Sequence, residues 1–184
     1  MIKRRYEEAA YVLDFIPEGR VRRRGEFIAE PIVQLVGEEF FTLLEATVKP
    51  NMTVQLYERV YIGKEGREKI DRILGRISFD ELTATAKGEL PAVVEKIVRS
   101  QEQRFINFFN TAQPITPKMH AFELLPGIGK KFMWQIVGER EKKPFESFED
   151  FQRRTSIDPV KAVVKRIIEE LTTEQKHKIF TRPF

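Results

Sequence analysis

The chain has 184 residues, enough for one large or two small domains, and its hydrophobic content of 41% is typical of a soluble globular protein. It contains no cysteine, which excludes disulfides, cysteine-liganded zinc and iron–sulfur clusters. Because His120 and His177, the only histidines, fall in different predicted helices, we expect no metal site and no cofactor. The net charge of +4 falls entirely in residues 111–184, since residues 1–110 carry equal numbers of basic and acidic side chains.

We expect no targeting signal at the N-terminus. Residues Met1–Arg5 are basic, but Asp14 interrupts the apolar stretch that follows them. We therefore expect neither a signal peptide nor a transmembrane span, and we predict a cytoplasmic protein with no membrane partner.

Residues 1–80 are predicted to form a small β-barrel. Four apolar segments are joined by short polar turns: 10–16, 27–36 with a break at Pro31, 40–48, and 54–62. An OB-like barrel is the preferred interpretation, and an SH3-like barrel would give the same pattern. Residues 63–75 are charged and rich in glycine, so we expect a loop or a short helix there.

A cluster of arginines lies between the first two predicted strands. Arg20, Arg22, Arg23 and Arg24 are flanked by Gly19 and Gly25. One interpretation is a flexible loop that binds phosphates, and the other is a solvated surface turn.

Residues 81–184 are predicted to form an all-α domain, which makes the fold α+β. Ser78 and Glu81 have the spacing of a capping box, and helical periodicity follows from about residue 83 to 110. Pro91 is expected to kink or reset that helix. The aromatic side chains at helical spacing here are interpreted as core residues.

A tight turn between two helices is predicted in residues 116–141. Thr116 and Pro117 are suited to begin a helix, which Pro126 and Gly127 should end near Leu125. A second helix then begins at Lys130.

Such a turn directs backbone N–H groups and the positive end of the second helix toward one point in solvent. We therefore predict a phosphate site formed by Gly127, Ile128, Gly129, Lys130 and Lys131.

This pattern resembles the helix-hairpin-helix motif, a phosphate-backbone binder without sequence specificity. The chain matches the motif at these positions: Phe122, Leu125, Pro126, Gly127, Ile128, Gly129, Ile136 and Arg140. It departs at Met133, where the family usually has alanine. Some motifs of this family only pack helices, so a structural hairpin is the alternative.

Residues 147–171 are predicted to form a degenerate second unit. At a shift of 29 residues, Phe122 falls on Phe151, Ile128 on Ile157 and Met133 on Ala162, the small residue that the motif prefers. Ser156 and Asp158 replace the two glycines. The carboxylate of Asp158 would repel an anion, so this half is expected to be structural.

Helices of this second unit are expected to start after Ser147 and Asp158. Lys161 and Lys165, with Arg153 and Arg154, either extend the basic surface or are ordinary solvated residues. The apolar residues of 176–184, including Phe180 and Phe184, are expected to dock on the body of the protein.

Catalytic motifs are not recognisable, and no catalytic residue is predicted. The main enzyme alternative is a DNA glycosylase of the helix-hairpin-helix superfamily, with Asp150 as its catalytic aspartate. Ser147 and Asp150 look instead like the start of a helix, and the Asp-x-His usual in that family is absent. A two-metal nuclease built from scattered acids has no motif in its favour.

Taken over nearly its full length, the chain resembles an archaeal family of predicted RNA-binding proteins that combine an OB-like barrel with a helix-hairpin-helix domain. The resemblance implies a non-enzymatic nucleic-acid-binding protein whose partner is RNA, such as tRNA or ribosomal RNA, rather than DNA. Two alternatives remain: a protein-interaction scaffold with a structural hairpin, and a DNA-binding or repair factor.

Overall fold

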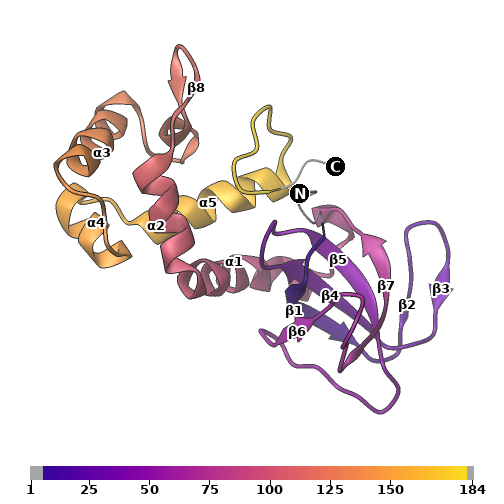
Figure 1. Cartoon of the computed structure of the whole chain (residues 1–184). Coiled ribbons are helices and arrows are strands. Elements are labelled where there is room, and N and C mark those ends of the chain that lie inside the picture. Colours follow the sequence, from indigo (N-terminus) through magenta and orange to yellow (C-terminus); the bar gives the residue numbers. More distant parts are fainter. Residues whose placement is uncertain (1–5, 182–184) are drawn as a thin grey trace. The chain divides into compact units, whose positions relative to one another are not determined.

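Residues 6–181 are described by a computed structural model, and they divide into two units with different secondary structure (Figure 1). One unit comprises residues 6–93 with Phe180 and Thr181, and the other comprises Val94–Ile179. The first contains the sheet and the second contains most of the helices, which confirms the α+β class. The division falls inside helix α1 (Ala84–Ser100), whereas the sequence suggested residues 80 and 81.

The first unit is built on a curled, five-stranded antiparallel half-barrel (Figure 1). Its strands pair in the order β6-β1-β4-β5-β7. Their bounds are β1 Ala9–Ile16, β4 Ile32–Gly37, β5 Leu43–Val48, β6 Arg59–Tyr61 and β7 Ile70–Arg76. A separate hairpin, β2 (Arg20–Val21) with β3 (Phe27–Ile28), lies between β1 and β4 in the chain.

Strands β4 and β5 are buried along their whole length, and they are the central pair of the core. The core side chains come from all five strands and from Val54 and Ile62 beside β6. Pro31 separates β3 from β4, as predicted, because proline cannot donate a hydrogen bond to a neighbouring strand.

Two strand predictions were wrong in extent. The segment predicted over 54–62 forms a strand only at Arg59–Tyr61, and the predicted loop 63–75 contains most of β7. Strand β7 is an edge strand with several exposed residues, so its sequence has little apolar alternation. Pairing with β5, a partner distant in the chain, determines its conformation.

The remaining elements follow in chain order, with bounds η1 Phe79–Glu81, α1 Ala84–Ser100, α2 Glu102–Thr111, β8 Pro114–Thr116, β9 Met119–His120, η2 Ala121–Leu124, α3 Lys130–Lys142, α4 Phe148–Thr155 and α5 Pro159–Thr172. The predicted capping box of Ser78 and Glu81 is present, but it begins the short η1. The long predicted helix breaks at Gln101, where φ is −122°, and not at Pro91, which lies inside α1.

A buried carboxylate organises the turn after β4. Glu7 accepts hydrogen bonds from the N–H groups of Glu39 (2.9 Å), Phe40 (2.7 Å) and Thr42 (3.4 Å). Burial raises the pKa of the Glu7 carboxyl, while these N–H groups act to lower it. Gly37 leaves the space that this side chain occupies, since a Cβ there would lie 2.0 Å from Glu7 Cδ.

We predict that Gly37→Ala destabilises the half-barrel. The added methyl group would push the Glu7 carboxylate away from its donors, leaving the buried carboxylate and the partly buried N–H groups without partners at a cost of about 1–3 kcal/mol. Chemical denaturation should show this loss. Gly66→Ala is no suitable control because its φ is +78°, but Gly88→Ala is, since a Cβ there meets nothing within 4 Å. An unchanged midpoint for Gly37→Ala would contradict the packing argument.

Candidate nucleic-acid interface

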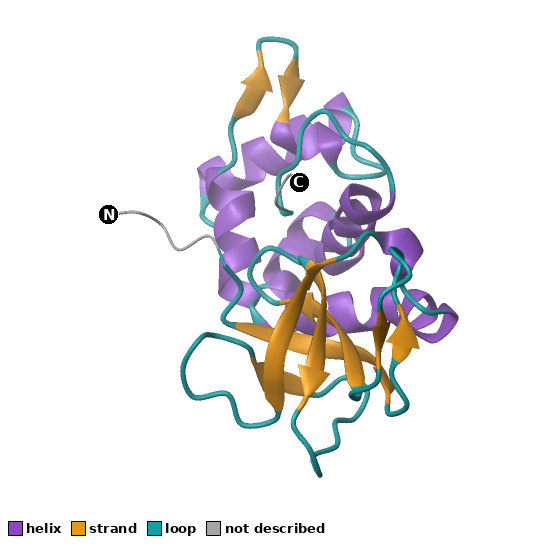
Figure 2. Ribbon diagram, turned by 90° about the vertical axis from the view of Figure 1, so that its right-hand side faces the viewer, coloured by secondary structure: helices purple, strands orange, loops and turns teal. Residues whose placement is uncertain are grey.

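The segment before the glycine turn is not the α-helix that the sequence predicted. Residues 114–120 form the β8–β9 hairpin, which extends away from the helices in Figure 2, and only Ala121–Leu124 is helical, as the 3-10 helix η2. The start is displaced because His120 is the N-cap: its Nδ1 accepts the Phe122 N–H (3.1 Å), and its own N–H donates to Glu123 (2.7 Å).

The turn itself depends on Gly127, which has a φ of +83°. The N–H of Ile128 donates to the carbonyl of Leu125 (3.0 Å), and the Ile128 side chain is buried. This N–H is therefore already used inside the turn, so Ile128 has a packing role. Gly129 is the N-cap of α3, with an extended backbone at a φ of −94° and a ψ of −165°.

The N-terminus of α3 is open. Its first intrahelical bond runs from the Met133 N–H to the Gly129 carbonyl (2.9 Å), so the preceding N–H groups have no helical acceptor. Glycine has no side chain that could cap them, and no other side chain among residues 6–181 does so. The helix therefore presents its positive end without an internal anion.

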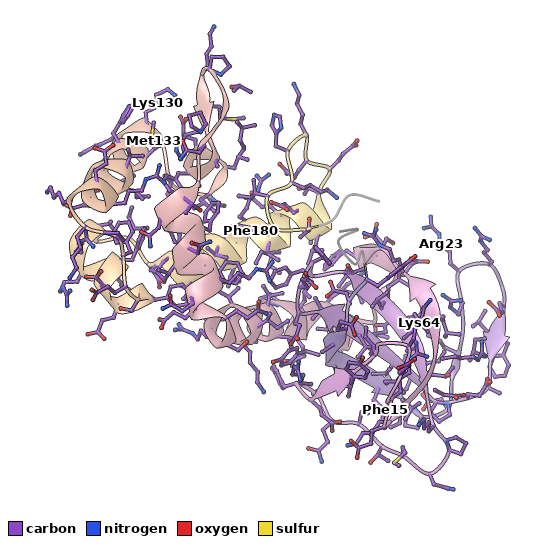
Figure 3. All side chains as sticks on the ribbon, viewed as in Figure 1. Phe15, Arg23, Lys64, Lys130, Met133 and Phe180 are labelled. Atoms are coloured by element: carbon purple, nitrogen blue, oxygen red, sulfur yellow. The ribbon has the colours of Figure 1, made fainter. Side chains whose placement is uncertain are left out.

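The two lysines at this terminus differ in availability. Lys130, labelled in Figure 3, donates from Nζ to the Lys118 carbonyl (2.9 Å) and to Glu123 Oε1 (2.9 Å). Lys131 is exposed and has no side-chain partner within the described residues. Lys131 is thus the lysine that is free to contact an anion.

A hollow separates the glycine turn from the start of α5. It is lined by Pro126, Gly127, Ile128, Phe132, Ile157, Asp158, Lys161, Ala162 and Lys165. Within residues 6–181, neither Lys161 nor Lys165 has a side-chain partner. The structure thus brings these two lysines to the same hollow as the glycine turn, an arrangement that the sequence left open.

The two turns of this unit have the same backbone pattern. Gly127 and Ser156, 29 residues apart, both adopt the left-handed conformation, with φ of 83° and 62°. Two residues later, Gly129 and Asp158 are the N-caps of α3 and α5. The predicted helix starts after Ser147 and Asp158 are confirmed, since each side chain accepts the predicted capping hydrogen bond.

The packing around the two turns is also alike. Phe122 and Phe151, again 29 residues apart, are both fully buried. Phe109 contacts both rings, with centroid distances of 5.8 Å to Phe122 and 4.2 Å to Phe151. The interpretation of the aromatic residues of the predicted helix 83–110 as core is confirmed for Phe105 and Phe109, and Phe108 is half-buried.

The turns differ in their caps. Asp158 Oδ1 accepts the Lys161 N–H (3.1 Å), so the first turn of α5 carries its own carboxylate. Gly129 supplies none to α3. The N-terminus of α5 is therefore already neutralised, and that of α3 is not.

Arg166 is a residue that the sequence interpretation missed. It is 3% exposed and pairs with the buried Glu170, donating from Nε to Oε2 (2.9 Å). It also donates to the carbonyls of Leu124 (3.3 Å) and His177. The sequence did contain a signal for this pair, because an arginine and a glutamate four residues apart on the apolar face of a helix indicate a buried ion pair.

The predicted arginine loop is a hairpin with two of its four arginines already paired. Arg20 and Arg22 lie 3.6 Å and 3.0 Å from the carboxylate oxygens of Glu45, which is 2% exposed. These two arginines neutralise a buried charge. Arg23, which Figure 3 shows at the hairpin tip, and Arg24 have no side-chain partner among residues 6–181.

Asp150 has a structural role. Its Oδ2 accepts the Glu146 N–H (3.1 Å) and an Arg154 N–H (3.1 Å), and its Oδ1 accepts from Arg153 (2.7 Å). The Glu146 N–H, followed by the two guanidinium groups, lowers the pKa of the Asp150 carboxyl. Oδ2 thus ties Glu146, in the segment before α4, to the helix, and Oδ1 pairs with Arg153 inside the helix.

The C-terminal segment is partly described. Phe180 is buried, in line with the docking prediction, and the Ile179 N–H donates to Glu170 (3.0 Å). Phe184 lies outside the described residues. His177 follows α5 in irregular structure and is not in a helix. In the part of the chain that the structure describes, no helix has the length and apolar character needed to cross a bilayer.

Residues 6–182 match the family described as "Protein of unknown function (DUF655)", and the chain belongs to that family. It is 48% identical over 176 residues to the uncharacterized protein MJ0038 of Methanocaldococcus jannaschii, covering 96% of this chain and 79% of that protein. The crystal structure of Af1531 from Archaeoglobus fulgidus is similar, with a TM-score of 0.87 and 44% identity, covering 96% and 100% of the two chains. Both relatives are archaeal, in line with the resemblance noted from the sequence.

We predict that Asp150→Asn lowers the melting temperature at neutral pH. The folded-state pKa of Asp150 is lowered, so its stabilisation is present above the unfolded pKa of about 3.9 and is lost as the pH falls through the folded value. The deficit should therefore shrink on acidification below about pH 4. Thermal unfolding from pH 7 downward measures it.

Asp71→Asn is the control, because Asp71 is exposed and its carboxylate has no partner within residues 6–181. A pH-independent deficit for Asp150→Asn, or an equal one for Asp71→Asn, would rule out the carboxylate interactions as its cause.

Proposed function

We propose that this protein binds nucleic acid without catalysing a reaction, and that it holds a backbone phosphate at the glycine turn. The observation that carries the proposal is the uncapped N-terminus of α3 at Gly129, with Lys131 in its first turn. Backbone N–H groups at a helix N-terminus form an anion site. The hollow beside the turn, with Lys161 and Lys165, supplies further positive charge.

The absence of a cap at Gly129 supports binding over a purely structural turn. A turn that only packs helices gains stability from Asp, Asn, Ser or Thr at the N-cap, as Asp158 provides for α5. Packing does not require glycine at position 129, since a Cβ there would meet nothing within 4 Å. Glycine instead leaves the helix end accessible to a ligand.

In this proposal the turn and its flanking elements act as a helix-hairpin-helix unit, in which η2 replaces most of the first helix. The half-barrel, with five strands and the edge strands β6 and β7, suits a partly open barrel of the OB type. RNA is the preferred partner over DNA because of the family resemblance of the sequence. Arg23 and Arg24 offer a second basic contact in the other unit.

Binding should depend strongly on salt and weakly on base sequence. If about four to six phosphates are contacted, the logarithm of affinity should fall with the logarithm of salt concentration at a slope of roughly −3 to −5. Fluorescence anisotropy with tRNA, a ribosomal RNA fragment and DNA at several salt concentrations measures the slope. No binding at low salt, or a slope near zero, would favour a protein-interaction scaffold.

The paired variant Lys161→Ala with Lys165→Ala should flatten that slope by up to about two. Lys142→Ala with Lys143→Ala is the matched control, because these exposed lysines pair with Glu139 and Glu146 away from the turn. Equal effects of the two pairs would mean that net charge alone drives binding.

The sharpest test exchanges the two N-caps. Gly129→Asp places a carboxylate at the predicted phosphate position, and we expect binding to weaken by about 1.5–3 kcal/mol, the scale of losing charge-assisted hydrogen bonds. Stability should be kept, because a φ of −94° suits aspartate and aspartate is a favourable N-cap.

Asp158→Ala is the companion variant. It should lower stability by about 1 kcal/mol through the lost cap and leave nucleic-acid affinity intact. Anisotropy and chemical denaturation of both proteins give the comparison. Equal binding defects in the two variants would show that the division into one binding and one structural turn is wrong.

A further inference from the structure

Trp134, the only tryptophan in the chain, is in solvent. It lies in α3, one turn after the open helix end, and is 65% exposed. Tryptophan is usually largely buried, so this exposure is unfavourable unless a ligand covers the ring.

The same helix register is buried in the second half of the repeat. Positions 131, 134 and 138 of α3 correspond, 29 residues later, to Val160, Val163 and Ile167 of α5. Those three side chains of α5 are buried in the core. In α3 the corresponding positions carry Lys131 and Trp134, which are exposed, and Gly138, which is half-buried, so this face of α3 is not part of the core.

The residues around the ring are suited to a nucleotide. Lys131, which has no side-chain partner within the described residues, lies three positions before Trp134, one helical turn away, and Lys130, whose Nζ is bound to Lys118 and Glu123, lies four before it. Side chains of a helix tilt toward its N-terminus, so the indole lies over the turn that these lysines begin, about 6 Å along the axis from Lys130. A strand whose phosphate is bound at the helix end therefore meets the ring within one nucleotide.

Gly138 leaves the helix surface on the other side of the ring bare. Glycine inside a helix is destabilising, and a Cβ at this position would meet nothing within 4 Å, so packing does not require it. The indole thus has a lysine on one side and open helix surface on the other.

We propose that Trp134 is a stacking platform for an unpaired nucleobase, and that the ligand is therefore a single-stranded or looped region of nucleic acid. This inference rests on the proposed phosphate site and specifies its substrate class. Every base has a π-face, so stacking on tryptophan adds affinity with little sequence preference. A paired base in a duplex has its faces covered by its neighbours and cannot stack in this way.

Intrinsic fluorescence tests the proposal directly, because the chain has one tryptophan. The full-length protein is titrated with a mixed-sequence single-stranded RNA of about 12 nucleotides and, separately, with the duplex of the same sequence. We expect the single strand to quench Trp134 emission and the duplex to leave it largely unchanged.

Two variants distinguish the contribution of an aromatic ring at position 134 from that of an apolar side chain. Trp134→Leu should weaken single-strand binding, measured by anisotropy, by about 5- to 100-fold, and Trp134→Phe should lose much less. Duplex affinity should be the same in all three proteins. The exposure of Trp134 and the helix propensity of leucine make a folding defect unexpected, and circular dichroism checks this.

The outcomes distinguish the two proposals. Salt-dependent binding with no fluorescence change and no loss in Trp134→Leu would overturn the stacking role and leave the phosphate site standing. An equal loss for duplex and single strand would also overturn it, because the ring would then contact the backbone. If no nucleic acid binds at low salt, both proposals fail. The exposed Trp134 is then better explained as a contact for a partner protein.

Discussion

The guanidinium of Arg166 joins three segments on which the candidate interface depends. It is buried in α5, pairs with Glu170, and donates to the carbonyl of Leu124 before the glycine turn and to that of His177 after α5. A buried ion pair is strongly destabilising when one partner is lost, because the other charge remains desolvated. The position of the turn against α5, and hence the hollow between them, therefore depends on one arginine that is almost fully buried.

Within that arrangement, a small chemical difference separates two otherwise similar turns. Gly127 and Ser156 share a left-handed backbone, and Gly129 and Asp158 share the N-cap position. The Asp158 carboxylate accepts a hydrogen bond from the first turn of α5. Gly129 has no side chain, so the first N–H groups of α3 lack such an acceptor. The start of α5 is therefore stabilised by its own cap, whereas the start of α3 has no side-chain cap.

The local features of this protein could be predicted from its sequence. The strands at 9–16 and 43–48, the caps Ser147 and Asp158, and the helix beginning at Lys130 follow from patterns contained within a few residues. Apolar periodicity and capping hydrogen bonds act over one helical turn or a few strand residues, so they are visible without a partner. The glycine turn could be predicted for the same reason. The repeat was visible because corresponding residues of the two turns lie 29 positions apart.

What only the tertiary structure decided involves partners far apart in the chain. Strand β7 forms against β5, Arg20 and Arg22 neutralise Glu45, and Lys161 and Lys165 reach the hollow of the glycine turn. Strand pairing and ion pairing depend on which groups folding brings within a few ångströms, and sequence spacing does not encode that distance. The sequence by itself therefore determined where the proposed phosphate site would lie, and the fold determined which charges near it remain unpaired within residues 6–181.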